Sequence, residues 1–187
     1  LAVAHLTGDG ATAGEEVRAV AATVAAMLPE LAAMANAAAA HLGHDAPLTV
    51  IGRGDSFASA AMAALLVEEA AKLPCEGLTG GQFRHGPLEL VRAGFRAVVF
   101  TGDGPARPLT EALVTRIAEL GGRVVTIGTA PAAASDAVLP LALPQVAPGL
   151  LALIEMLPIQ YLVIPLAIAR GFEPAAFLNA QKITTGE

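Results

Sequence analysis

Cysteine, aromatic residues and charge are all scarce in this chain of 187 residues. The single cysteine, Cys75, cannot form an intramolecular disulfide or a multi-cysteine zinc site. Aromatic residues make up 4% with no tryptophan, and the net charge is −6, which excludes stacking platforms and a basic surface for nucleic acid. The four histidines are too scattered to indicate a metal site. We therefore expect no nucleic-acid partner and no bound metal ion.

Hydrophobic residues, in contrast, make up 55% of the chain, and charged residues only 15%. This composition excludes intrinsic disorder, and the length is sufficient for one domain with a sizeable core. The chain begins with Leu1 rather than methionine and shows no secretory leader. These features favour a cytoplasmic location and are compatible with a segment of a longer protein.

The most apolar stretch covers residues 147–169 and raises the question of a membrane, since the mean hydropathy is +0.61. Glu155 lies near the middle of this stretch, where a carboxylate in lipid is costly. A helix buried in a core or an oligomer interface is therefore expected, without a membrane. Together with the alanine-rich residues 60–71, the stretch offers more apolar surface than a small domain buries alone, which predicts a homodimer.

Short apolar strands alternate with helices along the chain. This alternation predicts an α/β fold: a three-layer αβα sandwich around a parallel sheet of about five strands. We expect a helical lead-in over 1–46, an α/β domain over 47–171 and a C-terminal tail over 172–187. The expected strands cover 47–51, 73–78, 95–100, 123–127 and 136–141; the expected helices cover 12–42, split or kinked at Pro29, 57–72, 108–120 and 147–170.

Two glycine loops follow strands, at residues 52–56 and 101–104. Ligands of parallel sheets bind at the carboxyl ends of the strands, and a helix N-terminus favours anions. The first loop lacks the Gly-Lys-Ser/Thr of a nucleotide-binding loop, and Phe57 stands where a dinucleotide loop has its third glycine, so no cofactor is expected. The loop equally fits a tight turn with Asp55 or Ser56 as the N-cap.

Four side chains are candidates for acid–base chemistry. Glu68 and Glu69 project about 100° apart on a helix. A carboxylate among the apolar neighbours there would have a raised pKa and could carry a proton, although both carboxylates would more commonly be solvated. His85 stands beside a Gly-Pro turn, which suits catalysis or a structural bond to a turn carbonyl. Lys182, one of two lysines, would ordinarily be a solvated tail residue.

The order of these pieces resembles the sugar isomerase (SIS) family. The loop GRGDSF at 52–57, then Glu69, then GQFRHGPL at 81–88 and the tail NAQK at 179–182 carry the resemblance, which covers about residues 17–187. The pattern is most similar to the second SIS half of the isomerase domain in glucosamine-6-phosphate synthases and to stand-alone phosphosugar isomerases and deaminases.

The resemblance implies a flavodoxin-like SIS fold and an enzyme that isomerises a sugar phosphate between aldose and ketose, or an aminosugar-phosphate isomerase or deaminase. Glu69 would move the proton between C1 and C2 through an enediol. His85 would assist ring opening and could reach a neighbouring subunit's site. Lys182 would lie in a loop covering the sugar. The substrate-binding residues expected on this basis are Gly54, Ser56, Thr101 and Gln181.

This chain also departs from the family pattern. Leu66 replaces a lysine that the family carries three residues before the catalytic glutamate. The family binds phosphate mainly through loops of the first SIS half, whereas one half is present here, and Asp103 in its second loop would repel phosphate. A glutaminase domain is missing, so ammonia transfer from glutamine is not expected of this chain. Two alternatives stay open: a phosphosugar-binding module without turnover, and a half-domain that completes a partner's site.

Overall fold

Five parallel strands form one sheet in the order β2-β1-β3-β4-β5. The computed structural model describes residues 8–130, 132–147 and 149–179. The parallel sheet confirms the predicted α/β fold, and most expected strands lie within two residues of their predicted bounds. The strands are β1 (Leu48–Gly52), β2 (Cys75–Thr79), β3 (Arg96–Phe100), β4 (Arg123–Gly128) and β5 (Val138–Ala142).

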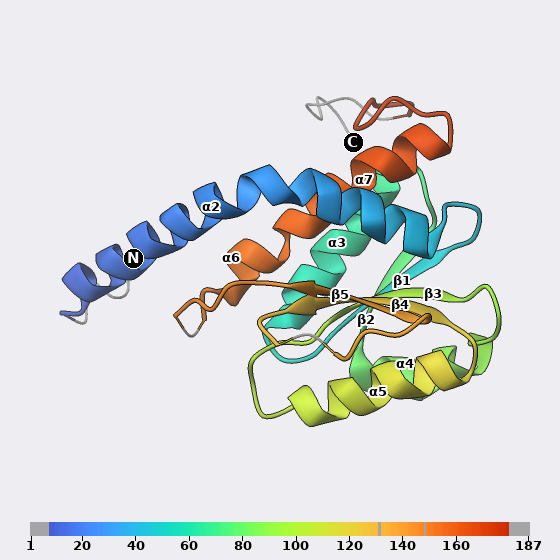
Figure 1. Ribbon diagram of the computed structural model, residues 1–187, viewed down its shortest axis with the longest axis horizontal. Coiled ribbons are helices and arrows are strands. Elements are labelled where there is room, and N and C mark those ends of the chain that lie inside the picture. The colour runs from blue at the N-terminus through green and yellow to red at the C-terminus, as the bar shows by residue number, and fades with distance from the viewer. Residues whose placement is uncertain (1–7, 131, 148, 180–187) are drawn as a thin grey trace.

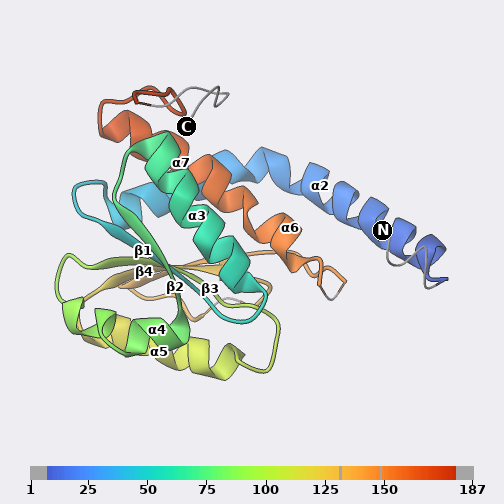
Figure 2. The same cartoon turned by 180° about the vertical axis from the view of Figure 1, so that it is seen from behind.

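Helices cover both faces of the sheet, so the molecule has the three layers expected (Figures 1 and 2). A short 3₁₀ turn over Pro87–Leu90 follows α4. One layer holds α2 (Gly10–Leu42), α3 (Ser56–Ala71), α6 (Leu151–Glu155) and α7 (Leu157–Ala169); the other holds α4 (Gly80–Arg84) and α5 (Arg107–Glu119).

The central strands are apolar throughout because both of their faces are buried. Val50 and Val98 belong to the core cluster under α2, α3 and α7. Their chain neighbours Ile51 and Val99 belong to the cluster under α4 and α5. Successive side chains of a strand point to opposite faces, so each strand contributes to both clusters.

Helix α2 is a single helix of 33 residues with Pro29 inside it, so of the split or kink expected there, the split does not occur. Proline removes one backbone donor and leaves the carbonyl of Ala25 without its helical partner. Both Ala25 and Pro29 are exposed, which allows water to satisfy that carbonyl. The N-terminal part of the helix extends beyond the sheet (Figure 1).

The expected helix over 147–170 was wrong in its extent, because it consists of α6 and α7 joined at Met156. Pro158 stands in the first turn of α7, where its missing N–H has no helical partner to lose. The stretch from Leu151 to Ala169 and helix α2 are each long and apolar enough to cross a membrane by length and composition. Half of the most apolar window of Leu151–Ala169 is buried inside the protein, as in the core helix of a globular domain.

Candidate functional site

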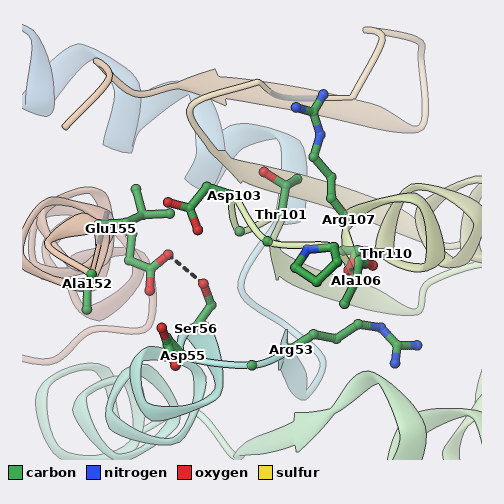
Figure 3. A pocket seen from close by; sticks show the side chains of 16 residues that line it. Arg53, Asp55, Ser56, Thr101, Asp103, Ala106, Arg107, Thr110, Ala152 and Glu155 are labelled. Carbon is green, nitrogen blue, oxygen red and sulfur yellow. Dashed lines mark hydrogen bonds between the residues drawn. The ribbon is translucent and has the colours of Figure 1, made fainter. Parts of the chain in front are cut away.

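A cavity of about 270 Å³ lies at the ends of β1 and β3. The chain adds β2 on one side of β1 and then β3, β4 and β5 on the other, so the topological switch point of the sheet lies between β1 and β3. In sheets with this strand order, ligands bind at that point, outside the carboxyl ends of the strands. Gly54 and Ser56 follow β1, and Thr101 follows β3; all three line the cavity, together with residues of α6 (Figure 3). The structure therefore brings together three of the predicted substrate-binding residues. The fourth, Gln181, lies outside the described residues.

The first loop turns sharply from β1 into α3, and two glycines allow it. A Cβ on Gly52 would lie 2.2 Å from the carbonyl oxygen of Ser56, so any other residue would clash with backbone. Gly54 has a φ of +55°, a conformation that side chains disfavour. Asp55 occupies the N-cap position but makes no side-chain capping bond. The Ser56 hydroxyl bonds outside its own helix instead.

Glu155 is the residue that the sequence analysis missed. Its side chain is fully buried and accepts hydrogen bonds from the hydroxyls of Ser56, at 3.0 Å, and Ser59. Burial raises the pKa of this carboxyl; the charges of Asp103 and Asp55 act in the same direction, and the two serine bonds oppose them. The sequence contained a signal for this contact, because an acidic residue within a long apolar stretch requires a polar partner when it is buried.

The charge around this cavity disfavours an anion. Asp55, Asp103 and Glu155 contribute carboxylates, and Figure 3 shows the guanidinium groups of Arg53 and Arg107 extending away from Glu155. The Arg107 guanidinium is also paired with Glu111, its Nε lying 2.8 Å from the carboxylate. A sugar phosphate placed here would bring its dianion next to carboxylates. The cavity therefore does not have the character of a phosphate site.

The ionisation of Glu155 is expected to make the stability of the fold depend on pH. Because its folded pKa is raised, the deprotonated form opposes folding; this penalty is absent below the ordinary value of 4.5 and grows as pH rises through the folded pKa. Glu155→Gln removes the charge; its amide oxygen can accept from one serine hydroxyl, and its NH2 group can donate to the other. The melting temperatures of the variant and of the unmodified protein are measured by circular dichroism. The difference, variant minus unmodified protein, should increase as pH rises from 4.5 to 8. Glu30→Gln, at an exposed position on α2, is the control; an equal pH trend in both variants would contradict the assignment.

A second cavity, of about 180 Å³, lies at the C-terminal end of α3. Glu68, Glu69 and Lys72 line it together with the segment 177–179. Both carboxylates are exposed, so the described residues do not give Glu69 the apolar surroundings that were expected. The two nevertheless differ, because Glu68 accepts a bond from the backbone N–H of Cys75 at 3.4 Å, while the Glu69 carboxylate has no hydrogen-bond partner among the described residues. Lys182 follows this segment and lies outside the described residues.

His85 lies on the other side of the sheet. It ends α4, which begins with a capping box between Thr79 and Gln82. The imidazole is exposed and bonds to no described residue, so the alternative of a histidine bonded to a turn carbonyl is not what this structure shows. Its backbone N–H donates to the carbonyl of Gln82.

The predicted site residues therefore occupy three separate places. Ser56 and Glu69 are thirteen positions apart on α3, which corresponds to about 20 Å along the helix axis. His85 ends α4, which belongs to the opposite helical layer (Figures 1 and 2). A single copy of this chain does not gather Glu69, His85 and the first cavity into one site.

The strand order and the alternation of strands and helices define a doubly wound α/β domain. The family model for the SIS domain matches residues 45–170, more than half of the chain. The chain belongs to the SIS domain family, as the sequence motifs predicted.

Curated relatives place the chain beside one group of enzymes. It is 31% identical over 140 residues to glutamine–fructose-6-phosphate aminotransferase [isomerizing] of Pyrococcus horikoshii, covering 73% of this chain and 23% of that protein. The corresponding protein of Pyrobaculum aerophilum is 32% identical over 141 residues, again with 73% and 23% coverage. The chain thus spans about a quarter of the length of these relatives.

Solved structures show the same fold. The C-terminal domain of glucosamine-fructose-6-phosphate aminotransferase from Francisella tularensis superposes with a TM-score of 0.78 at 21% identity, covering 90% of this chain and 48% of that one. Glucosamine-6-phosphate deaminase from Thermotoga maritima gives a TM-score of 0.60 at 22% identity, covering 80% and 44%. Both neighbours are about twice as long as the part that this chain matches.

Proposed function

We propose that this chain is the second half of a SIS phosphosugar isomerase, which interconverts an aldose and a ketose phosphate through an enediol. The observation that carries the proposal is the position of Glu69: its carboxylate has no hydrogen-bond partner among the described residues and lines a cavity together with the segment 177–179. Isomerisation requires one base that removes a proton from one carbon and returns it to the next. A carboxylate held in this way has the chemistry for both transfers.

The phosphate would be bound outside this chain. The first cavity is acidic, which is why we assign no phosphate to Gly54, Ser56 and Thr101 in spite of their position. The chain matches about half of the neighbouring structures, so a further SIS half is the natural source of a phosphate site. We propose an upstream half as that partner, a homodimer as the assembly and the cytoplasm as the location.

The closely related reaction, isomerisation coupled to release of an amine, uses the same base and an enediolamine in place of the enediol.

The main rival is a module that binds a phosphosugar without turnover. Its support is that Glu69 and His85 are not gathered in one chain and that Leu66 stands where the family has a lysine. Loss of turnover in a Glu69 variant separates the enzyme from the rival.

Sugar phosphates are expected to protect the complete protein against heat. A ligand at 100 times its Kd stabilises the native state by about 2.7 kcal/mol, which shifts the melting temperature by roughly 5–10 °C for a domain of this size. Fructose 6-phosphate and glucosamine 6-phosphate should produce this shift; fructose and inorganic phosphate are the controls. The 187-residue chain alone should show almost no shift. Micromolar binding of fructose 6-phosphate by the chain alone would show that the phosphate site lies in this half.

A further inference from the structure

Lys72 is the one cationic side chain among the described residues that line the cavity beside Glu69. The two residues are three positions apart at the end of α3, and residues with that spacing are neighbours on one face of a helix. None of the ion pairs in the described ranges involves Lys72, although Glu68 and Glu69 line the same cavity. No carboxylate of the described chain therefore neutralises the ammonium.

The backbone of Lys72 has a left-handed conformation, which favours glycine. It caps the C-terminus of α3 with φ 53° and ψ 29°, the left-handed conformation in which helices usually place glycine. A lysine there is disfavoured by the contact between its Cβ and the backbone. An unfavourable residue at a cavity is a reason to look for a role of its side chain.

The Lys72 ammonium is held in place by two backbone carbonyl groups, one in its own helix and one in the segment after α7. It donates to the carbonyl oxygen of Glu69 at 2.5 Å and to that of Ala176. The N–H of Ala175 donates to the carbonyl of Ala70, and the guanidinium of Arg170 donates to the carbonyl of Lys72 at 2.9 Å. An ammonium has three N–H donors, so these two bonds leave one donor for a ligand.

We propose that Lys72 contacts the substrate and holds the sugar oxygen on which negative charge develops next to Glu69. This inference rests on the proposed isomerase function. When the Glu69 carboxylate takes the proton from the C–H bond, that electron pair forms the C–C double bond and the carbonyl pair moves to oxygen. The ammonium donates to this oxygen and keeps its own proton. Glu69 then returns its proton to the neighbouring carbon, and the adjacent hydroxyl proton passes to the former carbonyl oxygen.

A set of charge-moving variants of the complete protein tests the proposal with fructose 6-phosphate as substrate. Lys72→Met should lower kcat/KM by about 10²-fold, the range for loss of one preorganised donor, and Lys72→Arg should retain more activity. The double variant Leu66→Lys/Lys72→Met places a lysine on the other side of Glu69, about 9 Å along the helix from position 72. Its kcat/KM should be at least about tenfold higher than that of Lys72→Met. The double variant restores a cation but not the bond to Ala176. In Lys72→Ala, added ethylammonium should give a similar recovery, which does not require residue 66 to tolerate lysine.

The outcomes separate this inference from the proposed function. Full activity of Lys72→Met together with an inactive Glu69→Gln would overturn the role of Lys72 and leave the isomerase assignment in place. A loss in Lys72→Met that neither the second lysine nor ethylammonium recovers would also overturn it, because Lys72 would then only anchor the chain end at Ala176. Unchanged activity of Glu69→Gln would overturn the proposed function itself. Circular dichroism melting of each variant confirms that the proteins compared are folded.

Discussion

Glu69→Gln in the complete protein is expected to lower the rate of sugar-phosphate isomerisation by at least about 10²-fold, the lower range for loss of a general base. Glutamine has nearly the same shape and cannot take up the proton. Solvent deuterium should enter C1 or C2 of fructose 6-phosphate with the unmodified protein and not with the variant, as measured by NMR. Exchange is the more direct readout, because it reports proton removal even when product release limits turnover.

Glu68→Gln is the matched control for this experiment. Glu68 lines the same cavity one residue earlier, but its carboxylate accepts from the backbone N–H of Cys75 at 3.4 Å. Glutamine keeps an oxygen that can accept this bond, so folding and activity should change little. Equal activity in the two variants, or deuterium exchange that persists in Glu69→Gln, would reject Glu69 as the base and favour the module that binds without turnover.

The fold was largely predictable because its signals are local. Runs of β-branched residues such as Val98 and Val99 define a strand buried on both faces, and glycine loops after the strands mark the edge where ligands bind. The errors came from prolines. Pro29 was expected to split or kink a helix that continues without a split, and Pro158 begins a helix inside a stretch that was expected to be continuous. The outcome at Pro29 depends on whether water can reach the freed carbonyl, and the outcome at Pro158 depends on where the new helix begins; a sequence pattern contains neither.

The candidate site was less predictable because its contacts join distant segments. Glu155 meets Ser56 and Ser59 across about a hundred residues of chain. Lys72 lies beside Glu69 through local helical spacing, but the bond that holds it reaches Ala176 across a similar distance and does not follow from that spacing. The motif resemblance selected Glu69 and His85 as a pair of interest, and only the layers of the fold show that the sheet separates the helices that carry them (Figure 1).

That separation has a consequence for the assembly. Glu69 belongs to the layer of α3, and His85 to the layer of α4, on opposite faces of one sheet (Figures 1 and 2). If one reaction requires both, the site must combine Glu69 of one copy with His85 of another. In a dimer with twofold symmetry, each of two sites would then take one residue from each chain.

Mixing two inactive variants is therefore expected to restore activity. Glu69→Gln and His85→Ala homodimers should each lack most of their isomerase activity. Random mixing gives heterodimers for half of the molecules, each with one doubly altered and one intact site, so the mixture should recover about a quarter of the original activity. Subunits are exchanged by joint unfolding and refolding, and light scattering first establishes that the protein is a dimer. Glu69→Gln mixed with Glu69→Ala is the control, because no arrangement of those two chains restores the base. A mixture of the complementary variants that stays as inactive as this control would show that Glu69 and His85 do not meet across subunits.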